Sequence, residues 1–226
     1  MKTSRRSIEK IVEDQVLQWN RIKSEKKDAP TGIHVITVSR ESGSGGAMVA
    51  ARLARELGFD LFHREVIQDM AESANISTRI VETLDEKGLS VLEDSIAAIT
   101  QDRHLWPDEF LKHLMKVVGT IGKHGRAVIV GRGAHFILPP DENLKVRVIS
   151  PLAVRIRNVA RELDITESEA QRMILKTDSD RRSFSRKYFY ADVTDPLHYD
   201  LVINTARMSI DAAVKSIVAA LNELNA

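Results

Sequence analysis

Several absences in the amino-acid sequence limit what the protein can be. It contains no cysteine, which excludes disulfide bonds and thiolate metal sites and is typical of the reducing cytoplasm. Aromatic residues are only 5% of the 226 and are dispersed, so they offer no platform for stacking the bases of single-stranded nucleic acid. The longest apolar runs are five residues, too short to span a membrane. With 33 basic and 32 acidic residues, the net charge of +1 gives no reason to expect a polyanionic partner.

The residues that are present predict a globular protein. Hydrophobic residues make up 43% and charged residues 29% of the chain, enough for one large domain or a core domain with insertions. The seven histidines do not form an H-E-x-x-H motif or a close grouping with carboxylates, so we expect no metal site built by the protein alone. We therefore expect a cytoplasmic protein that has no membrane or nucleic-acid partner.

A glycine-rich segment is the most informative part of the chain. Residues 36–46 read ITVSRESGSGG, an apolar strand that enters a turn and then a helix. Unpaired N–H groups and the positive end of the helix dipole favour an anion at such a helix start, and glycines let the backbone approach it. The segment predicts a phosphate-binding loop. The alternative is an ordinary strand-to-helix connection that uses glycine for tight packing.

This loop lacks the lysine of the Walker pattern G-x-x-x-x-G-K-[ST]. Gly45 takes the second glycine, but Arg40 falls on the first, Gly46 on the lysine and Ala47 on the hydroxyl residue. Because the charge of a transferring phosphoryl group must still be neutralised, other cations are needed, and Arg40 is the nearest. Magnesium would then be held through phosphates and water.

The pattern of apolar residues predicts alternating strands and helices. Continuous apolar strands separated by helices favour a parallel sheet covered on both faces. Helix starts are indicated by Ser150 before Pro151, by a capping box at 166–169 and by Ser209. The predicted strands are 34–39, 59–62, 127–130, 146–149 and 201–203.

Two further segments are predicted to be helical. Residues 64–125 contain no convincing strand and indicate three or four helices, broken near 73–77, Gly88 and Pro107. Residues 1–30 are predicted to be a peripheral appendage, with a polar linker at 23–28 after a helix that carries Ile8, Val12, Val16 and Trp19 on one side.

A cluster of arginines precedes the last predicted strand. Residues 178–187 read DSDRRSFSRK and concentrate four cations within ten residues. Phosphoryl transfer depends on positioning and on stabilising the charge of the phosphoryl oxygens, for which the fixed donor fork of arginine is suited. The alternative is a solvated loop with internal Asp/Arg pairs.

Three motifs, taken in order, resemble the cytidylate kinase-like family, relatives of the nucleoside monophosphate kinases. They are VSRESGSGG at 38–46, VGRG at 130–133 and YDLVINT at 199–205, and the resemblance covers residues 33–223. It implies an α/β, P-loop kinase-type three-layer fold with a parallel five-stranded sheet, in a kinase domain at 31–226. It also implies a helical acceptor-binding insertion at about 64–125 and an arginine-rich lid at about 178–190.

The resemblance also implies roles for individual residues. The acceptor-binding candidates are Arg132, which follows a strand, and Arg64; an arginine that satisfies nearby carbonyls and a surface Arg/Glu helix start are the respective alternatives. Cytidylate kinases carry aspartate where this chain has Gly133, and relatives often carry aspartate where it has His63. The catalytic candidates are Arg40, Asp178, Arg181, Arg182 and Arg186, and the ATP-binding candidates are Ser42, Gly43, Ser44, Gly45, Gly46, Ala47 and Thr205.

The expected activity is therefore ATP- and Mg²⁺-dependent phosphotransfer to a small-molecule substrate. The resemblance implies a nucleoside monophosphate as acceptor, with CMP or dCMP favoured. Because the lysine, the hydroxyl residue and the acceptor aspartate are all absent at their expected places, a nucleotide-binding sensor or pseudokinase of the same fold is the alternative.

Overall fold

The computed structural model describes residues 8–24 and 32–226, which belong to two compact units. One unit comprises helix α1 (Ile8–Ser24) and the segment His63–Gly125, and the other comprises Gly32–Phe62 and Arg126–Ala226. The predicted linker at 23–28 lies outside the described residues from residue 25 onward.

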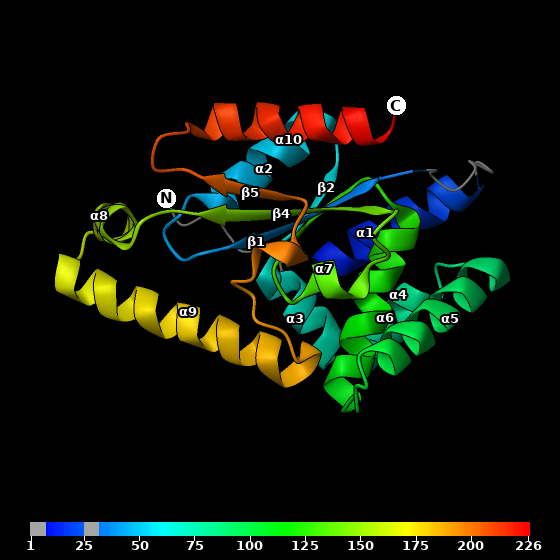
Figure 1. Ribbon diagram of the computed structural model, residues 1–226. Helices are drawn as coiled ribbons and strands as arrows, with labels where there is room; N and C mark the ends of the chain where they lie inside the picture. The colour runs from blue at the N-terminus through cyan, green and yellow to red at the C-terminus, as the bar shows by residue number, and fades with distance from the viewer. Residues whose placement is uncertain (1–7, 25–31) are drawn as a thin grey trace. The chain divides into compact units, whose positions relative to one another are not determined.

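The larger unit is built on a sheet of five parallel strands, in the order β2-β3-β1-β4-β5 (Figure 1). This confirms the predicted fold class. Strand β4 begins three residues earlier than predicted: the polar residues Asn143 and Lys145 flank Leu144, which enters the apolar core together with Val146 and Val148. The strands are β1 (Val35–Arg40), β2 (Asp60–Phe62), β3 (Ala127–Val130), β4 (Asn143–Ile149) and β5 (Leu201–Asn204).

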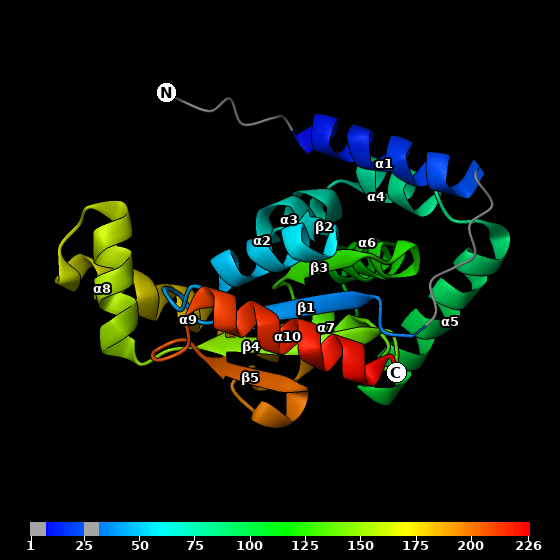
Figure 2. The same cartoon turned by 90° about the horizontal axis from the view of Figure 1, so that it is seen from above.

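One face of the sheet is covered by α2 (Gly46–Leu57) and α10 (Ile210–Leu224), as Figure 2 shows from above. Their apolar sides and alternate strand residues form one core, in which Val38, Val148, Leu53 and Ile217 are almost completely buried. The short helix α7 (Ala134–Ile137) and the long helix α9 (Glu167–Phe189) lie on the other side of the sheet (Figure 1). The sheet therefore has helices on both faces.

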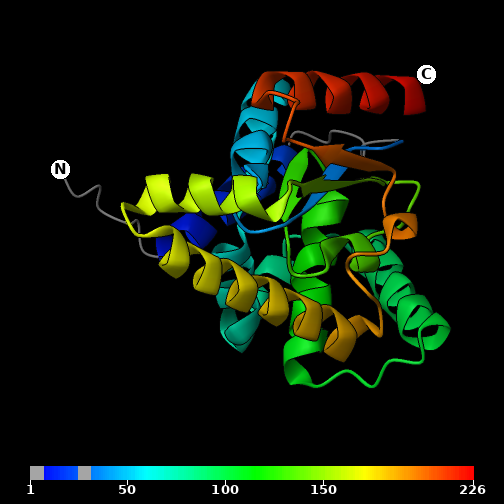
Figure 3. The same ribbon diagram turned by 60° about the vertical axis from the view of Figure 1, so that its left-hand side comes forward.

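Helices α8 (Leu152–Leu163) and α9 follow β4 and are joined by a short turn (Figure 3). The predicted capping box at Thr166 is present, with Glu169 as its partner, and Ser209 caps α10 as predicted. The predicted cap at Ser150 is wrong, because α8 begins one residue later with Pro151 as its cap, and the serine hydroxyl does not reach the first turn. The arginine-rich segment at 178–187 is part of the continuous helix α9 and is not a loop.

The helical unit is organised around α6 (Glu109–His124), which packs against α3 (Arg64–Glu72), α4 (Ala74–Val81) and α5 (Glu86–Asp102). Gly119 lets α5 approach closely, since a Cβ atom there would lie 2.3 Å from the Leu92 side chain. The break predicted near Gly88 lies just before it, at 82–85 between α4 and α5: Asp85 caps α5 by accepting the Gly88 N–H at 2.7 Å, so the glycine itself is in the first turn of the helix.

Helix α1 packs against α3 and α4 within this unit. Val12 and Trp19 are buried, and the Trp19 ring stacks on His124 at the end of α6 with 4.2 Å between ring centroids. Apolar burial and ring stacking therefore hold the N-terminal helix against the helical segment 63–125.

Candidate active site

The glycine-rich loop connects β1 to α2 at the C-terminal end of the central strand. Gly43 and Gly45 have φ angles of 78° and 76°, in the left-handed region that favours glycine. A Cβ atom at Gly43 would also lie 2.7 Å from the Arg155 carbonyl oxygen. The tight turn and the close approach of α8 therefore both depend on glycine at position 43.

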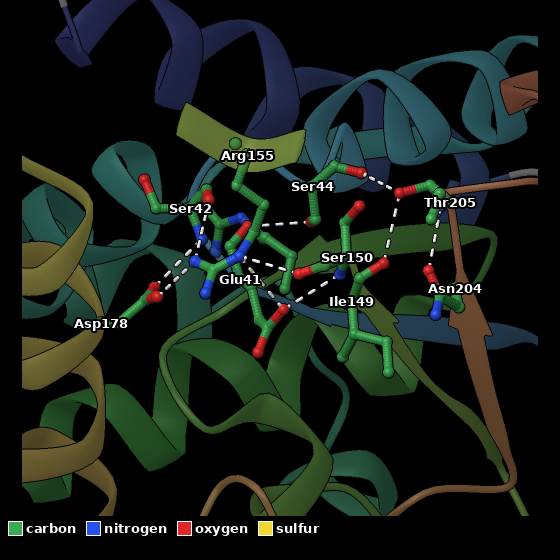
Figure 4. Close-up of polar contacts among 12 residues, drawn as sticks. Glu41, Ser42, Ser44, Ile149, Ser150, Arg155, Asp178, Asn204 and Thr205 are labelled. Carbon is green, nitrogen blue, oxygen red and sulfur yellow. Dashed lines mark hydrogen bonds and ion pairs between the residues drawn. The ribbon is translucent and has the colours of Figure 1, made fainter. Parts of the chain in front are cut away.

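Two carbonyl groups of the loop accept hydrogen bonds from side chains elsewhere in the chain, and Figure 4 shows the one from Thr205. Thr205 donates its hydroxyl to the Ser44 carbonyl at 2.7 Å, and Asn158 donates its side-chain amide to the Gly43 carbonyl at 2.9 Å. In contrast, the N–H groups of Gly43, Gly45 and Gly46 donate to no protein acceptor within the described part of the chain. A row of free N–H groups at a helix start is a site for an anion.

The side chain of Arg40 explains why the Walker lysine is missing. A Cβ atom at Gly46 would lie 2.6 Å from the Cβ atom of Arg40 and 3.2 Å from its Cγ atom. The arginine therefore fills the space that a side chain at position 46 would need. We call Arg40 and Gly46 a matched pair, because the side chain at position 40 excludes a side chain at position 46.

A buried group of charges borders the loop (Figure 4). Arg155 of α8 forms an ion pair with Asp178 of α9 at 2.6 Å and a longer one with Glu41 at 3.4 Å. The three side chains are only 10%, 13% and 24% exposed. Asp178 also accepts the Ser42 N–H at 3.0 Å, and Glu41 accepts the Ser150 N–H at 3.0 Å. These contacts tie α8 and α9 to the loop.

The arginines of α9 divide into two groups. Arg181 donates to the Arg40 carbonyl at 2.7 Å and lies 3.8 Å from Asp178, so it borders the loop. Arg186 is 65% exposed and pairs with Asp192 at 3.4 Å. Hydrogen bonds from the backbone and hydroxyl of Thr194, with a smaller contribution from Arg186, lower the pKa of Asp192. The structure thus brings Arg181 to the loop, while Arg186 bonds to the segment that follows α9.

Arg132 follows β3, and its guanidinium lies 4.9 Å from the centroid of the Phe184 ring of α9. The next residue, Gly133, has a φ angle of 67°, and a Cβ atom there would lie 2.2 Å from the Phe189 ring. Any side chain at position 133 would therefore collide with α9. This contact explains why the aspartate expected from the resemblance is replaced by glycine.

A profile described as the cytidylate kinase-like family matches residues 35–207. The chain belongs to the cytidylate kinase-like family. The match begins with β1 and ends beyond the threonine that supports the loop, so it contains the loop, Arg132 and the arginines of α9. The resemblance stated from the three motifs is confirmed.

Relatives are similar to the chain over most of their length. A protein from Methanopyrus kandleri named cytidylate kinase is 28% identical over 194 residues, which cover 84% of this chain and 94% of the relative. Another cytidylate kinase, from Pyrococcus furiosus, is 28% identical over 197 residues, covering 87% and 92%. Among solved structures, an uncharacterized protein from Eubacterium ventriosum has the same fold, with a TM-score of 0.63 and 20% identity over 83% of this chain and 98% of that chain.

The roles that the family resemblance implies for Arg64 and Thr205 remain predictions. Arg64 is the first residue of α3 in the helical unit, where it pairs with Glu65 at 3.0 Å. Thr205, named as an ATP-binding residue, uses its hydroxyl to hold the Ser44 and Ile149 carbonyls. Its side chain therefore joins the loop to the end of β4.

Three residues at the loop were missed by the sequence reasoning: Glu41, Arg155 and Asn158. Arg155 and Asn158 share one face of α8 because they are three positions apart, and that face turns to the loop. Polar residues on both sides of the apolar stripe of α8 were the available signal. Nothing in the local sequence named the loop as their partner.

The protein groups suit a triphosphate with Mg²⁺ better than a bare metal ion. Within the described residues, no group of three or more His, Cys, Asp or Glu side chains is placed to hold a metal ion. The carboxylates nearest the loop, Glu41 and Asp178, are already hydrogen-bonded and paired with Arg155. Free N–H groups and arginines instead provide donors for phosphate oxygens. Separately, no helix in the described part of the chain is both long and apolar enough to cross a lipid bilayer.

Proposed function

We propose that the protein is an ATP-dependent kinase that transfers the γ-phosphoryl group to a nucleoside monophosphate, with CMP or dCMP as the favoured acceptor. The observation that carries the proposal is the loop itself, whose carbonyls are bound from behind while the N–H groups of Gly43, Gly45 and Gly46 are free within the described residues. Membership of the cytidylate kinase-like family and the relatives named cytidylate kinase support this choice of reaction.

The donor would be held by the loop and by arginines. The N–H groups of Gly43, Gly45 and Gly46 would bind the phosphates of ATP, and Arg40 and Arg181 would replace the missing lysine in neutralising them. Mg²⁺ that enters with the ATP would supply positive charge and so reduce the negative charge of the phosphates. Since Asp178 fixes both Arg155 and the first N–H of the loop, it would position the donor site without touching the reacting atoms.

The acceptor would be held by other arginines. Arg132 is directed by its contact with Phe184 on α9, so movement of α9 would also move this arginine. Arg64 is proposed as a second contact to the acceptor phosphate, on the family resemblance alone. Arg182 and Arg186 are proposed to approach the phosphates when α9 closes and excludes water.

A nucleotide sensor or pseudokinase is the second candidate. It is favoured by Gly46 and Ala47 at the places of the lysine and hydroxyl residue, and by Asp178, which already occupies one loop N–H. Such a protein would bind ATP with Mg²⁺ but would transfer phosphate to no acceptor.

The test is a transfer assay with labelled ATP, Mg²⁺ and a panel of CMP, dCMP, UMP and AMP, with calorimetry of ATP binding in parallel. We expect labelled diphosphate product, highest with CMP or dCMP. Arg181→Met should reduce turnover by at least about 10²-fold, because it removes a donor near the phosphates. The control is Arg172→Met, an exposed arginine two turns earlier on α9, which should keep wild-type turnover. ATP binding without transfer to any acceptor would favour the sensor, and absence of ATP binding would contradict both.

A further inference from the structure

Arg147 is a buried cation that the proposed donor site does not use. It lies in β4 between Val146 and Val148, which enter the apolar core under α2 and α10. Since side chains alternate along a strand, Arg147 points to the opposite face of the sheet, where Tyr199 and His135 of α7 lie with 4.9 Å between ring centroids. The arginine is only 6% exposed.

Its protein contacts are all neutral. The Nη1 atom donates to the Ser39 hydroxyl at 3.0 Å and to the Tyr199 hydroxyl at 3.5 Å, and the guanidinium lies 5.5 Å from the Tyr199 ring centroid. The tyrosine hydroxyl is itself fixed by the Val193 carbonyl at 2.8 Å and by Ser39 at 3.1 Å. Across residues 8–24 and 32–226, no carboxylate forms an ion pair with Arg147, and its Nε and Nη2 groups donate to no protein acceptor.

A buried guanidinium without an anion is costly, because desolvation of the charge is not repaid. The same unit shows the usual solution at Arg155, which is similarly buried and has two carboxylates beside it. At Arg147 the Nη1 atom is fixed by two hydroxyls, while the edge formed by Nε and Nη2 donates to no acceptor among the described residues. That edge binds a carboxylate or phosphate through two parallel hydrogen bonds.

Arg147 also lies in the part of the sheet where substrates bind in α/β proteins. Arg147 pairs in register with Ser39, which directly precedes Arg40 at the start of the phosphate loop. Both lie near the C-terminal ends of adjacent parallel strands, where ligands bind in open α/β sheets. Arg147 therefore lies on the strand next to the one that leads into the loop, on the face of the sheet that carries α7.

We propose that Arg147, oriented by Ser39 and Tyr199, is an anion-binding site that holds the phosphate of the monophosphorylated acceptor. The inference rests on the proposed kinase function for the identity of that anion, but the site is defined by its own residues. Arg147 binds through its Nε/Nη2 edge, and the two hydroxyls set the plane of the guanidinium. A binding role also explains why a charge is kept at a position where an apolar residue would fit the strand.

The experiment measures binding by calorimetry with CMP, cytidine, inorganic phosphate and Mg-ATP as separate probes. In Arg147→Met we expect CMP and inorganic phosphate to bind roughly 10- to 100-fold more weakly, because a charge-assisted bidentate contact is lost. Cytidine, which has no phosphate, and Mg-ATP should bind as they do to the wild type. Arg147→Lys keeps the charge but not the fork and should give an intermediate loss for CMP.

Lys145→Met is the matched control, because it removes a positive charge two residues away on the same strand face and should leave every affinity unchanged. Thermal unfolding checks that each variant is folded, and Arg147→Lys serves if the methionine variant is not. Wild-type affinity of an Arg147 variant for CMP and phosphate overturns the inference, as does absence of phosphate binding by the wild type. If phosphate binding depends on Arg147 but no acceptor is phosphorylated, the site stands and the kinase proposal fails.

Discussion

Two arginines on neighbouring elements, Arg155 and Arg147, are almost equally buried, with 8% and 6% of their surface exposed. Arg155 has the carboxylates of Asp178 and Glu41 beside it and also donates to two carbonyl groups. Among the residues that the structure describes, Arg147 contacts two hydroxyls and an aromatic ring but no carboxylate. Burial is therefore the same, and charge compensation is opposite.

The difference separates support from recognition. A guanidinium whose donors are all directed at protein groups fixes the elements that carry those groups, and Arg155 joins α8, α9 and the loop in this way. A guanidinium that keeps an unused donor edge costs folding free energy until an anion arrives. We infer that the donor side of the site is held in place by the fold, whereas the acceptor side is completed by its ligand.

The largest expected effect comes from replacing each arginine by methionine. Arg155→Met removes the ion-pair partner of Glu41 and the closer of the two arginines at Asp178, which keeps only Arg181 at 3.8 Å, and it should destabilise the protein by about 3 kcal/mol. For a chain of this length that corresponds to a fall in Tm of roughly 6–12 °C. Arg147→Met removes a charge that has no carboxylate partner, and we expect its Tm to be unchanged or raised. Thermal unfolding of the two variants side by side is the measurement.

Ligands sharpen this first comparison. Phosphate or CMP should raise the Tm of the wild type and of Arg155→Met, but not that of Arg147→Met, since only a protein that binds the ligand is stabilised by it. Equal destabilisation by the two substitutions would show that charge compensation does not distinguish the two sites.

The second prediction concerns the pair of Arg40 and Gly46 at the loop. Gly46→Lys restores the Walker lysine but places a Cβ atom against Arg40, and such overpacking should cost about 1–3 kcal/mol. In the Arg40→Gly background the same substitution should cost less, because the closest contact is gone and only the Val148 Cβ atom at 3.2 Å remains. A double-mutant cycle on thermal stability and on ATP affinity gives the coupling directly. A cost that is independent of residue 40 would mean that the two positions are not a matched pair.

The sheet and the loop were predictable because their signals are local. Apolar runs separated by helical patterns predict parallel strands, and the strand, glycine turn and helix at 36–46 predict an anion site without knowledge of any distant residue. The family resemblance rests on the same local motifs. The helix caps at Thr166 and Ser209 were also found, since a cap and its partner are three residues apart.

The supporting charges were not predictable, because their partners are distant in the sequence. Arg155 meets the Ser42 carbonyl across 113 positions, and Arg147 meets Ser39 across 108. The strand predicted at 146–149 contained Arg147 but missed residues 143–145, and its sequence did not show what the arginine contacts on the second face of the sheet. Burial and ion pairing appear only once the strands are placed side by side.

The reason why position 133 is a glycine could not be predicted from the sequence either. Gly133 departs from the aspartate of the relatives, but the sequence does not say whether this changes the acceptor or the packing. The structure shows that the Phe189 ring occupies the space. A departure from a family motif can therefore be imposed by the side chain of a residue more than 50 positions away.

The third prediction reads the charge at Arg147 without any ligand. Burial raises the pKa of Tyr199 above its ordinary value of 10.0, while the Ser39 hydrogen bond and the positive charge of Arg147 act in the opposite direction. Since the pKa is raised in the folded state, this tyrosine stabilises the fold fully below pH 10 and loses that contribution as the pH rises through the folded pKa. Tyr199→Phe should remove this part of the alkaline loss of stability and one late step in the absorbance titration at 295 nm.

Arg147→Met should move that late step to still higher pH, because the charge that favours the tyrosinate is gone while the burial remains. Lys145→Met keeps Arg147 in place and should leave the step where it is in the wild type. The effect is the smallest of the three, but it needs neither ATP nor an acceptor and so depends on no assumption about the reaction. If the step did not move in Arg147→Met, the guanidinium would not lie against Tyr199 as described, and the contrast with Arg155 would lose its structural basis.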